Sequence, residues 1–193
     1  MVGPRIVVLG TSGSGKSTLA RDLARELEID PICNDSLLWM PNWTLRPKPE
    51  FHAMLLRATA GEAWTFDGNL RAERDADRRV LERATHVVWL DLPFHVVMRQ
   101  LLIRTIRRAW TREVIFSGNR ESWRLSFFSR DSILLWGWTQ FDRYRAQYAR
   151  LFAALRSSPT SPICVRLTTS HEIAAWRAQF LNQQRLAASR AAG

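Results

Sequence analysis

Short apolar runs alternate with amphipathic stretches along most of this chain of 193 residues. Five segments, rich in β-branched and aromatic residues, have the length and composition of buried strands: 6–10, 31–39, 63–71, 85–93 and 162–169. Between and after them, apolar residues recur every three or four positions, which predicts helices over about 16–28, 47–61, 72–84, 93–109 and 171–188. Alternating strands and helices are typical of a parallel α/β sheet with helices on both faces.

The first strand leads into small residues before the helical pattern begins. The letters match G-x-x-x-x-G-K-S, with Gly10, Gly15, Lys16 and Ser17 in the fixed positions. Between a strand and a helix this motif is typical of a P-loop, whose backbone N–H groups surround phosphates at a helix N-terminus. We expect Lys16 to reach the β- and γ-phosphates and Ser17 to bind Mg²⁺. The residues predicted to hold the nucleotide are Gly10, Thr11, Ser12, Gly13, Ser14, Gly15, Lys16, Ser17 and Thr18. An ordinary Gly- and Ser-rich turn is the alternative interpretation.

Each of the next three apolar segments contains a carboxylate where its strand is expected to end. Because ligands of such sheets sit at the carboxyl ends of the strands, Asp35, Asp67 and Asp91 should share one edge with the P-loop. Asp67 is favoured to hold a Mg²⁺-bound water, since Gly68 after it lets a ligand approach. Asp91 is the alternative metal residue, although N-capping of the following helix is favoured for it. Asp35 should orient or deprotonate an acceptor hydroxyl, or cap the next turn.

The acceptor should lie between Asp35 and the end of the third strand. Trp39 can stack on a nucleobase or sugar face there, or close a small apolar core under a loop. Asn69 and Arg71 are predicted to bind a polar acceptor or its phosphate, with Arg74 as the substitute for Arg71.

Arginine is densest in the fourth predicted helix and just after it. Arg104, Arg108 and Arg112 are four residues apart, with Arg107 beside them, which predicts one stripe of a helix. We expect the stripe to be catalytic and to supply positive charge to a transferring phosphoryl group; a solvated basic face is the alternative.

A long segment, 113–158, precedes the last strand and is too long for a simple connection. Its aromatic content and its helical pattern after Ser132 predict a lid or cap, with Gly118 as hinge. Trp136, Trp138 and Phe141 are expected to bury this insertion against the core. Asn119 and Arg120, with Glu121, are predicted to form a polar substrate-binding cluster. Interleaved arginine and aromatic residues are also compatible with single-stranded nucleic acid. We expect one domain over residues 1–193, with the lid insertion at about 100–158.

Composition narrows the partners and the compartment. The net charge is +10, and arginine supplies almost all of the basic residues, since Lys16 and Lys48 are the two lysines. Such a balance favours polyanionic partners: phosphorylated small molecules, nucleic acid or an anionic membrane surface. The two cysteines, Cys33 and Cys164, form no disulfide framework, and no apolar run is long enough to span a bilayer. Together with the lack of a signal-peptide pattern, this predicts a reduced, cytoplasmic protein.

Blocks beyond the P-loop resemble the small P-loop kinases related to adenylate kinase. DGNLR, from Asp67 to Arg71, resembles the Asp-Gly-x-x-Arg pattern of adenylate kinases, although NLR stands where they have FPR. NDSLLWMPNW, FDGNL and SGNRES…FSRDSILLW resemble bacterial adenylate kinase-like or DNA topology modulation proteins, over roughly residues 4–155. The resemblance implies a P-loop NTPase fold with a five-stranded sheet of order 2-3-1-4-5, ATP with Mg²⁺, and a mobile lid carrying arginines.

These patterns favour a Mg²⁺- and ATP-dependent kinase acting on a nucleotide or small metabolite. A nucleic-acid-binding P-loop ATPase or regulator is the alternative, and it would need a basic patch away from the active edge. A GTPase switch is disfavoured, because the chain has no Asn-Lys-x-Asp guanine-reading motif.

Overall fold

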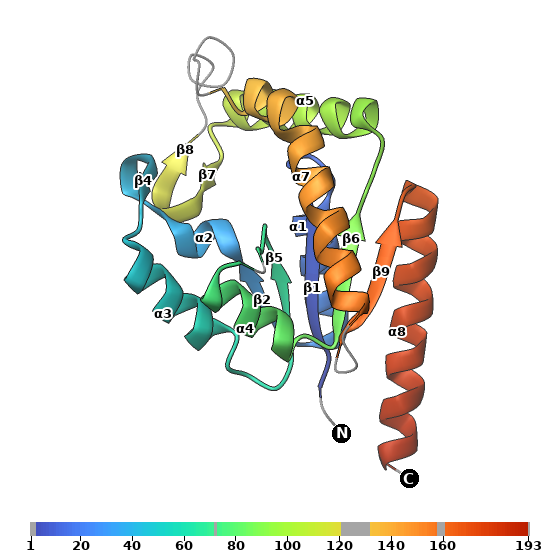
Figure 1. The fold of residues 1–193 in the computed structure, drawn as a ribbon. Coiled ribbons are helices and arrows are strands. Elements are labelled where there is room, and N and C mark those ends of the chain that lie inside the picture. The colour runs from blue at the N-terminus through green and yellow to red at the C-terminus, as the bar shows by residue number, and fades with distance from the viewer. Residues whose placement is uncertain (1–2, 72, 121–131, 158–160, 193) are drawn as a thin grey trace.

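Five strands form one parallel sheet whose order confirms the predicted topology (Figure 1). The structure is a computed structural model, and it describes residues 3–71, 73–120, 132–157 and 161–192. The strands are β1 (Arg5–Gly10), β2 (Asp30–Cys33), β5 (Trp64–Asp67), β6 (His86–Leu90) and β9 (Ile163–Leu167). Their order, β2-β5-β1-β6-β9, is 2-3-1-4-5 when the five are counted along the chain. The first strand is therefore central, and the P-loop lies in the middle of the carboxyl edge.

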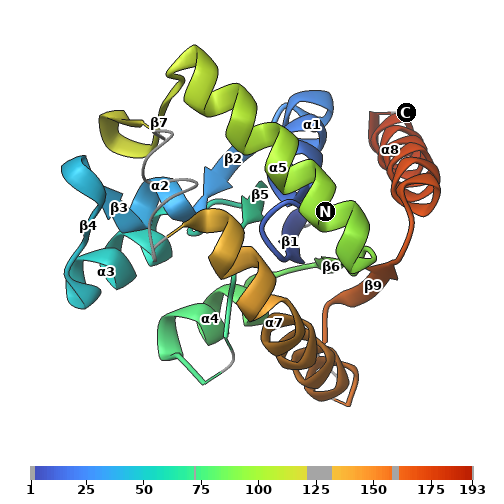
Figure 2. The ribbon, with the colours of Figure 1, turned by 90° about the horizontal axis from the view of Figure 1, so that it is seen from above.

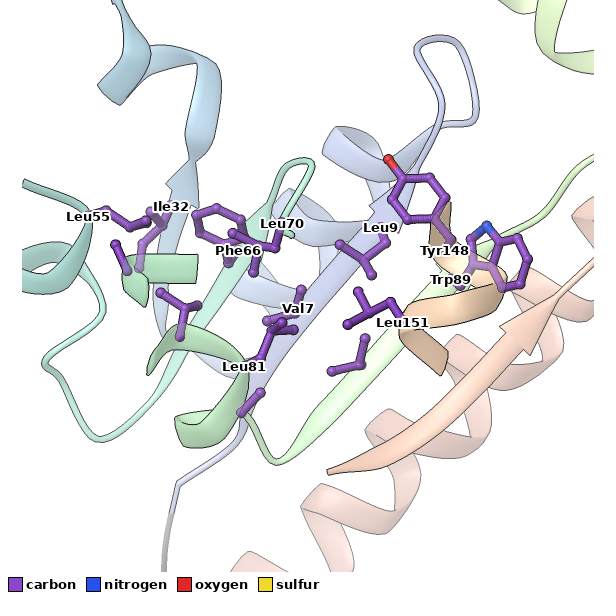
Figure 3. Packing of buried hydrophobic residues seen from close by; sticks show 14 of the residues in the cluster. Val7, Leu9, Ile32, Leu55, Phe66, Leu70, Leu81, Trp89, Tyr148 and Leu151 are labelled. Atoms are coloured by element: carbon purple, nitrogen blue, oxygen red, sulfur yellow. The ribbon is translucent and has the colours of Figure 1, made fainter. Parts of the chain in front are cut away.

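Helices cover both faces of the sheet (Figure 2). They are α1 (Lys16–Leu27), α2 (Asn34–Leu38), α3 (Lys48–Ala58), α4 (Asp75–Arg83), α5 (Phe94–Thr111), α7 (Ile133–Arg156) and α8 (Ser170–Ala192). Alternate residues of β1 face opposite layers, as the period of a strand requires. Ile6 and Val8 pack with α1 and α8, whereas Val7 and Leu9 pack with α4 and α7 (Figure 3).

Two short hairpins that were not predicted extend beyond the sheet. One consists of β3 (Trp39–Met40), the 3₁₀ turn η1 (Pro41–Trp43) and β4 (Thr44–Leu45). The other consists of β7 (Val114–Ile115), the 3₁₀ turn η2 (Phe116–Gly118) and β8 (Asn119–Arg120). We call them the 39–45 hairpin and the 114–120 hairpin. Strands of two residues carry too little alternation to be recognised in a sequence.

The helix α7 lies within the predicted lid insertion, but its second half packs against the core. Tyr148, Leu151 and Phe152 from its second half belong to the hydrophobic cluster between the sheet and α4. Of the three aromatic residues expected to bury the insertion, Phe141 is buried and Trp136 is half-buried. The expectation is wrong for Trp138, whose exposed fraction is 64% and whose ring meets the edge of Phe94.

Two element boundaries differ from the prediction. The second strand ends at Cys33, before the strand end expected at Asp35, because Asn34 starts a short helix there; Asp35 is therefore in the first turn of α2. The last helix, predicted over 171–188, continues to Ala192, and Arg185 within it forms an exposed ion pair of 3.1 Å with Glu26 of α1.

The two cysteines lie on opposite edge strands, β2 and β9, and both are free thiols. This agrees with the sequence, which predicts no disulfide framework.

Candidate active site

The loop between β1 and α1 has the geometry of an anion-binding nest. Gly13 and Gly15 both have left-handed φ, 91° and 88°. A Cβ at Gly13 would lie 2.6 Å from the carbonyl oxygen of Val97 in α5, whereas a Cβ at Gly15 would meet nothing within 4 Å. Helix α1 starts at Lys16 without a side-chain cap on its N–H groups. The open side of the loop at Gly15 therefore leaves room for an anion at the helix N-terminus.

A cavity of about 360 Å³ lies between the start of α1 and the second half of α5, beside this loop. The P-loop residues that line it are Gly13, Gly15, Lys16, Ser17 and Thr18. The remaining predicted nucleotide residues, Gly10, Thr11, Ser12 and Ser14, form the rear of the loop, where the Ser14 N–H donates to the Thr11 carbonyl at 3.1 Å. Arg21 of α1 and three arginines of α5 complete a strongly basic wall.

Only the first part of the predicted arginine stripe lies at the cavity, and its catalytic role stays a prediction. Arg104 and Arg108 line the cavity, and so does Arg107. Arg112 does not line it, because α5 ends at Thr111 and Arg112 turns away with a left-handed φ of 50°, exposed to solvent. A four-residue spacing places side chains on one stripe only while the helix continues, so the predicted stripe is wrong at Arg112.

An acidic side chain closes the basic cavity. Glu113 Oε2 lies 3.4 Å from Arg107 Nη2, and Glu113 Oε1 lies 3.9 Å from Arg108 Nε. Sequence reasoning missed Glu113 and Arg21. Arg21 is one helical turn after Ser17 and its Nε donates to the Ser17 carbonyl at 3.0 Å, so helical spacing from the motif could have found it.

The Asp35 carboxylate, in α2, lies within electrostatic reach of charged side chains from α1, β5 and α5. Burial raises the pKa of its carboxyl above the usual range; the cation of Lys16 opposes this rise, Asp67 adds to it, and Arg104 opposes it. The Asp35 carboxylate thus interacts with the P-loop lysine, the end of β5 and the arginine of α5. No side-chain cap of α2 is formed, so the capping alternative for Asp35 is not seen.

Asp67 is buried at the end of β5, paired in register with Val8 of β1 and Cys33 of β2. The Cys33 thiol lies near the Asp67 carboxylate; burial and this negative charge raise the pKa of the thiol to about 11. A Cβ at Gly68 would lie 2.4 Å from the Cβ of Asn34, so the close start of α2 requires glycine at this position. The approach of a ligand past Gly68 stays a prediction.

Asp91 is buried between two arginines from distant parts of the chain. Arg145 of α7 donates through Nε at 2.8 Å, and Arg166 of β9 donates through Nε at 2.9 Å. The guanidinium of Arg166 also stacks 4.8 Å from the centre of the Trp89 ring. Because α5 is preceded by Pro93 without a side-chain cap, the favoured N-capping interpretation of Asp91 is wrong.

The predicted acceptor residues fall into two groups. Asn69 and Arg71 lie in the loop after β5, half-buried, where the Arg71 N–H donates to Asp77 Oδ2 of α4 at 2.9 Å. Arg74 precedes α4, and its cation lies near the same Asp77 carboxylate.

The second group lies where the 39–45 and 114–120 hairpins meet. The Asn119 amide accepts from the Trp43 N–H and donates to the Met40 and Phe116 carbonyls, all within 2.9 Å. Its side chain therefore ties the hairpins together, and an acceptor contact for Asn119 stays a prediction. Trp39 meets Trp43 edge to face at 5.5 Å, and Arg120 is exposed on β8. The last member of the predicted cluster, Glu121, lies outside the described residues.

Over the described ranges, no helix is long and apolar enough to cross a membrane. Nor does that part of the chain contain a group of three or more His, Cys, Asp or Glu side chains that could hold a metal ion by themselves.

The sheet order and the glycine loop define a P-loop NTPase fold, and solved structures share it. A shikimate kinase from Acinetobacter baumannii, in complex with shikimate, is similar with a TM-score of 0.55, over 96% of this chain and 94% of its own, at 16% identity. A shikimate kinase from Bacteroides thetaiotaomicron gives 0.53, over 94% and 98%, also at 16% identity. At this identity the likeness establishes the fold. No protein-family model and no curated protein matches the sequence, so the adenylate kinase-like resemblance stays a prediction.

Proposed function

We propose that this protein is a Mg²⁺- and ATP-dependent kinase that phosphorylates a hydroxyl group of a small molecule. The observation that carries the proposal is the basic cavity beside the P-loop, lined by Lys16 and Arg104, with the Asp35 carboxylate within electrostatic reach of both cations. A carboxylate beside the cations of a P-loop cavity is the arrangement that phosphoryl transfer to a hydroxyl needs. The kinases that share the fold support the same reaction class.

On the donor side, the P-loop would hold the triphosphate. Lys16 would contact the β- and γ-phosphates, while Arg104 and Arg108 would stabilise the charge that develops during transfer. Ser17 and Asp67 have the oxygen ligands that Mg²⁺ prefers, either directly or through water. When bound, Mg²⁺ would neutralise part of the triphosphate charge. Asp67 suits this place better than Asp91, whose carboxylate is already engaged by Arg145 and Arg166.

On the acceptor side, Asp35 would act as the general base. The acceptor oxygen attacks the γ-phosphorus, its proton passes to the Asp35 carboxylate, and the bond from the γ-phosphorus to the bridging oxygen breaks to release ADP. Burial favours this role, since a raised pKa makes the carboxylate a better proton acceptor. Asn69 and Arg71, with Trp39, Asn119 and Arg120 from the hairpins, are the candidates for acceptor binding.

The test is a screen for acceptor-dependent ADP release from Mg·ATP. The panel contains nucleosides, nucleoside monophosphates, shikimate, gluconate and other hydroxylated acids, with single-stranded DNA and RNA as separate arms. We expect release with a small hydroxylated compound. Release that depends on nucleic acid alone would favour the P-loop ATPase alternative.

The matched variants are Lys16→Ala and Lys48→Ala, which remove the two lysines one at a time. Lys16 lines the cavity, whereas Lys48 is exposed at the start of α3. We expect Lys16→Ala to lose Mg·ATP binding in calorimetry as well as turnover, with an unchanged melting temperature, and Lys48→Ala to behave as the parent. Equal Mg·ATP affinity in Lys16→Ala and the parent would overturn the nucleotide site.

A further inference from the structure

The loop after β5, which carries Asn69 and Arg71, is held by side chains from two helices. From α4, Asp77 accepts the Arg71 N–H at 2.9 Å. From α7, Gln147 Nε2 lies 3.5 Å from the Leu70 carbonyl oxygen, and the Tyr148 hydroxyl lies 2.6 Å from Asn69 Oδ1. The shortest of these contacts is to the amide of Asn69, one of the residues whose atoms would meet an acceptor.

Tyr148 is fully buried, and its ring belongs to the hydrophobic cluster beside Trp89 and Leu9. Figure 3 shows its hydroxyl directed away from the other side chains of that cluster. Burial raises the pKa of this hydroxyl far above neutrality, so the group stays protonated. A protonated phenol has one hydrogen to donate.

Two oxygens compete for that hydrogen. Asn69 Oδ1 is at 2.6 Å, and the carbonyl oxygen of Gly10, the first residue of the P-loop motif, is at 3.4 Å. A separation of 2.6 Å is normal for O–H···O and short for N–H···O, which usually needs about 2.9 Å. The distance therefore supports the orientation in which Asn69 presents its oxygen to Tyr148 and keeps its N–H₂ group for another partner.

We propose that Tyr148 is a positioning residue for the acceptor site: its hydroxyl holds the Asn69 amide so that the side-chain N–H donors serve the acceptor. The inference rests on the proposed function. It assigns a hydrogen-bond acceptor atom, such as a hydroxyl or carboxylate oxygen, to the part of the substrate that meets Asn69. It also explains why the Tyr148 ring, which packs in the hydrophobic cluster, carries a hydroxyl group at its end.

The test compares Tyr148→Phe with Tyr144→Phe. Both variants remove one hydroxyl from α7; the two rings are 6.0 Å apart, and Tyr144→Phe leaves the bond to Asn69 in place. The probe is the panel compound that gives the fastest ADP release with the parent. For Tyr148→Phe we expect the KM of that compound to rise about three- to tenfold, the effect of losing one orienting hydrogen bond. The Kd of Mg·ATP and the values for Tyr144→Phe should stay close to those of the parent.

Two Asn69 variants separate orientation from packing. Asn69→Asp keeps an oxygen for Tyr148 and loses the N–H donors, so its acceptor KM should rise at least as much as that of Tyr148→Phe. In an Asn69→Ala background, Tyr148→Phe should change the acceptor KM little further, since no amide is left to orient.

The outcomes distinguish the inference from the proposed function. A parent that releases no ADP with any panel compound overturns both. An active parent whose acceptor KM is unchanged in Tyr148→Phe, or changes equally in Tyr144→Phe, overturns the role of Tyr148 alone. A rise in KM that persists in the Asn69→Ala background would also overturn it, because the hydroxyl would then act through another group.

Discussion

Replacing Glu113 by Gln should tighten Mg·ATP binding. Glu113 lines the basic cavity and places its carboxylate 3.4 Å from Arg107 and 3.9 Å from Arg108. If triphosphate oxygens bind in this cavity, they must share these guanidinium groups with Glu113 or displace it, and they are repelled by its charge in either case. Gln has nearly the same shape without the charge, so the substitution removes the competitor and keeps the packing.

The size of the effect follows from the distances and the exposure. The Arg107 and Glu113 side chains are 66% and 39% exposed, so this pair is screened and should contribute no more than about 0.2–1 kcal/mol. The Arg108 side chain is only 16% exposed, and opposite charges about 4 Å apart attract by about 1 kcal/mol even in water. Together the two contacts give about 1–2 kcal/mol, which corresponds to roughly tenfold in the Kd.

Calorimetric titration of Mg·ATP at low and high salt measures this effect. Glu82→Gln is the matched control: it removes the same charge from α4, outside the cavity, where Glu82 is 64% exposed beside Arg78. We expect tighter binding in Glu113→Gln alone, with a gain that shrinks as salt increases. Unchanged or weaker binding in Glu113→Gln, or an equal gain in Glu82→Gln, would show that the triphosphate does not compete with Glu113 for Arg107 and Arg108.

Two further predictions concern catalysis and pH. Arg108→Ala should lower kcat by about two orders of magnitude with a much smaller change in the Kd of Mg·ATP. Arg112→Ala, outside the cavity, should leave both values near those of the parent. An equal loss of kcat in the two variants would contradict the role of Arg108 in phosphoryl transfer. Because the folded-state pKa of Asp35 is raised, its ionised form disfavours folding above the ordinary aspartate range. Asp35→Asn should therefore raise the melting temperature at neutral pH, and this gain should vanish below pH about 4. An equal gain at both pH values would show that the ionisation of Asp35 is not its cause.

The strand, loop and helix of the P-loop could be predicted because their residues are close together in the sequence. The P-loop occupies nine consecutive positions, from Gly10 to Thr18, and a strand before it and a helix after it are both visible from periodicity. A parallel sheet then brings the ends of other strands to the same edge. This is why Asp35, although it belongs to a helix and not to a strand end, still lies within electrostatic reach of Lys16 and Asp67.

The errors lie where a residue's partner is distant or where a helix ends. The partners of Asp91 are 54 and 75 residues away, in a helix and an edge strand, and nothing local distinguishes such a carboxylate from an N-cap. Arg112 continues the helical spacing of its neighbours, but the backbone leaves the helix at that residue without a glycine or proline to mark the end. Tyr148 is spaced as a core residue of α7 and its ring is one, so its sequence position gives no sign of the hydroxyl bond to Asn69.

The two halves of the site are nevertheless linked by their charges. Burial alone would favour the protonated form of Asp35, and Lys16 and Arg104 are the cations that oppose this. In the proposed reaction the same two cations face the phosphates, so negative charge bound in the cavity would weaken their hold on the Asp35 carboxylate. The affinity of Asp35 for a proton would then rise once the nucleotide is bound, which is when a general base must take a proton from the acceptor. In the proposed reaction, binding of the nucleotide would in this way raise the base strength of Asp35.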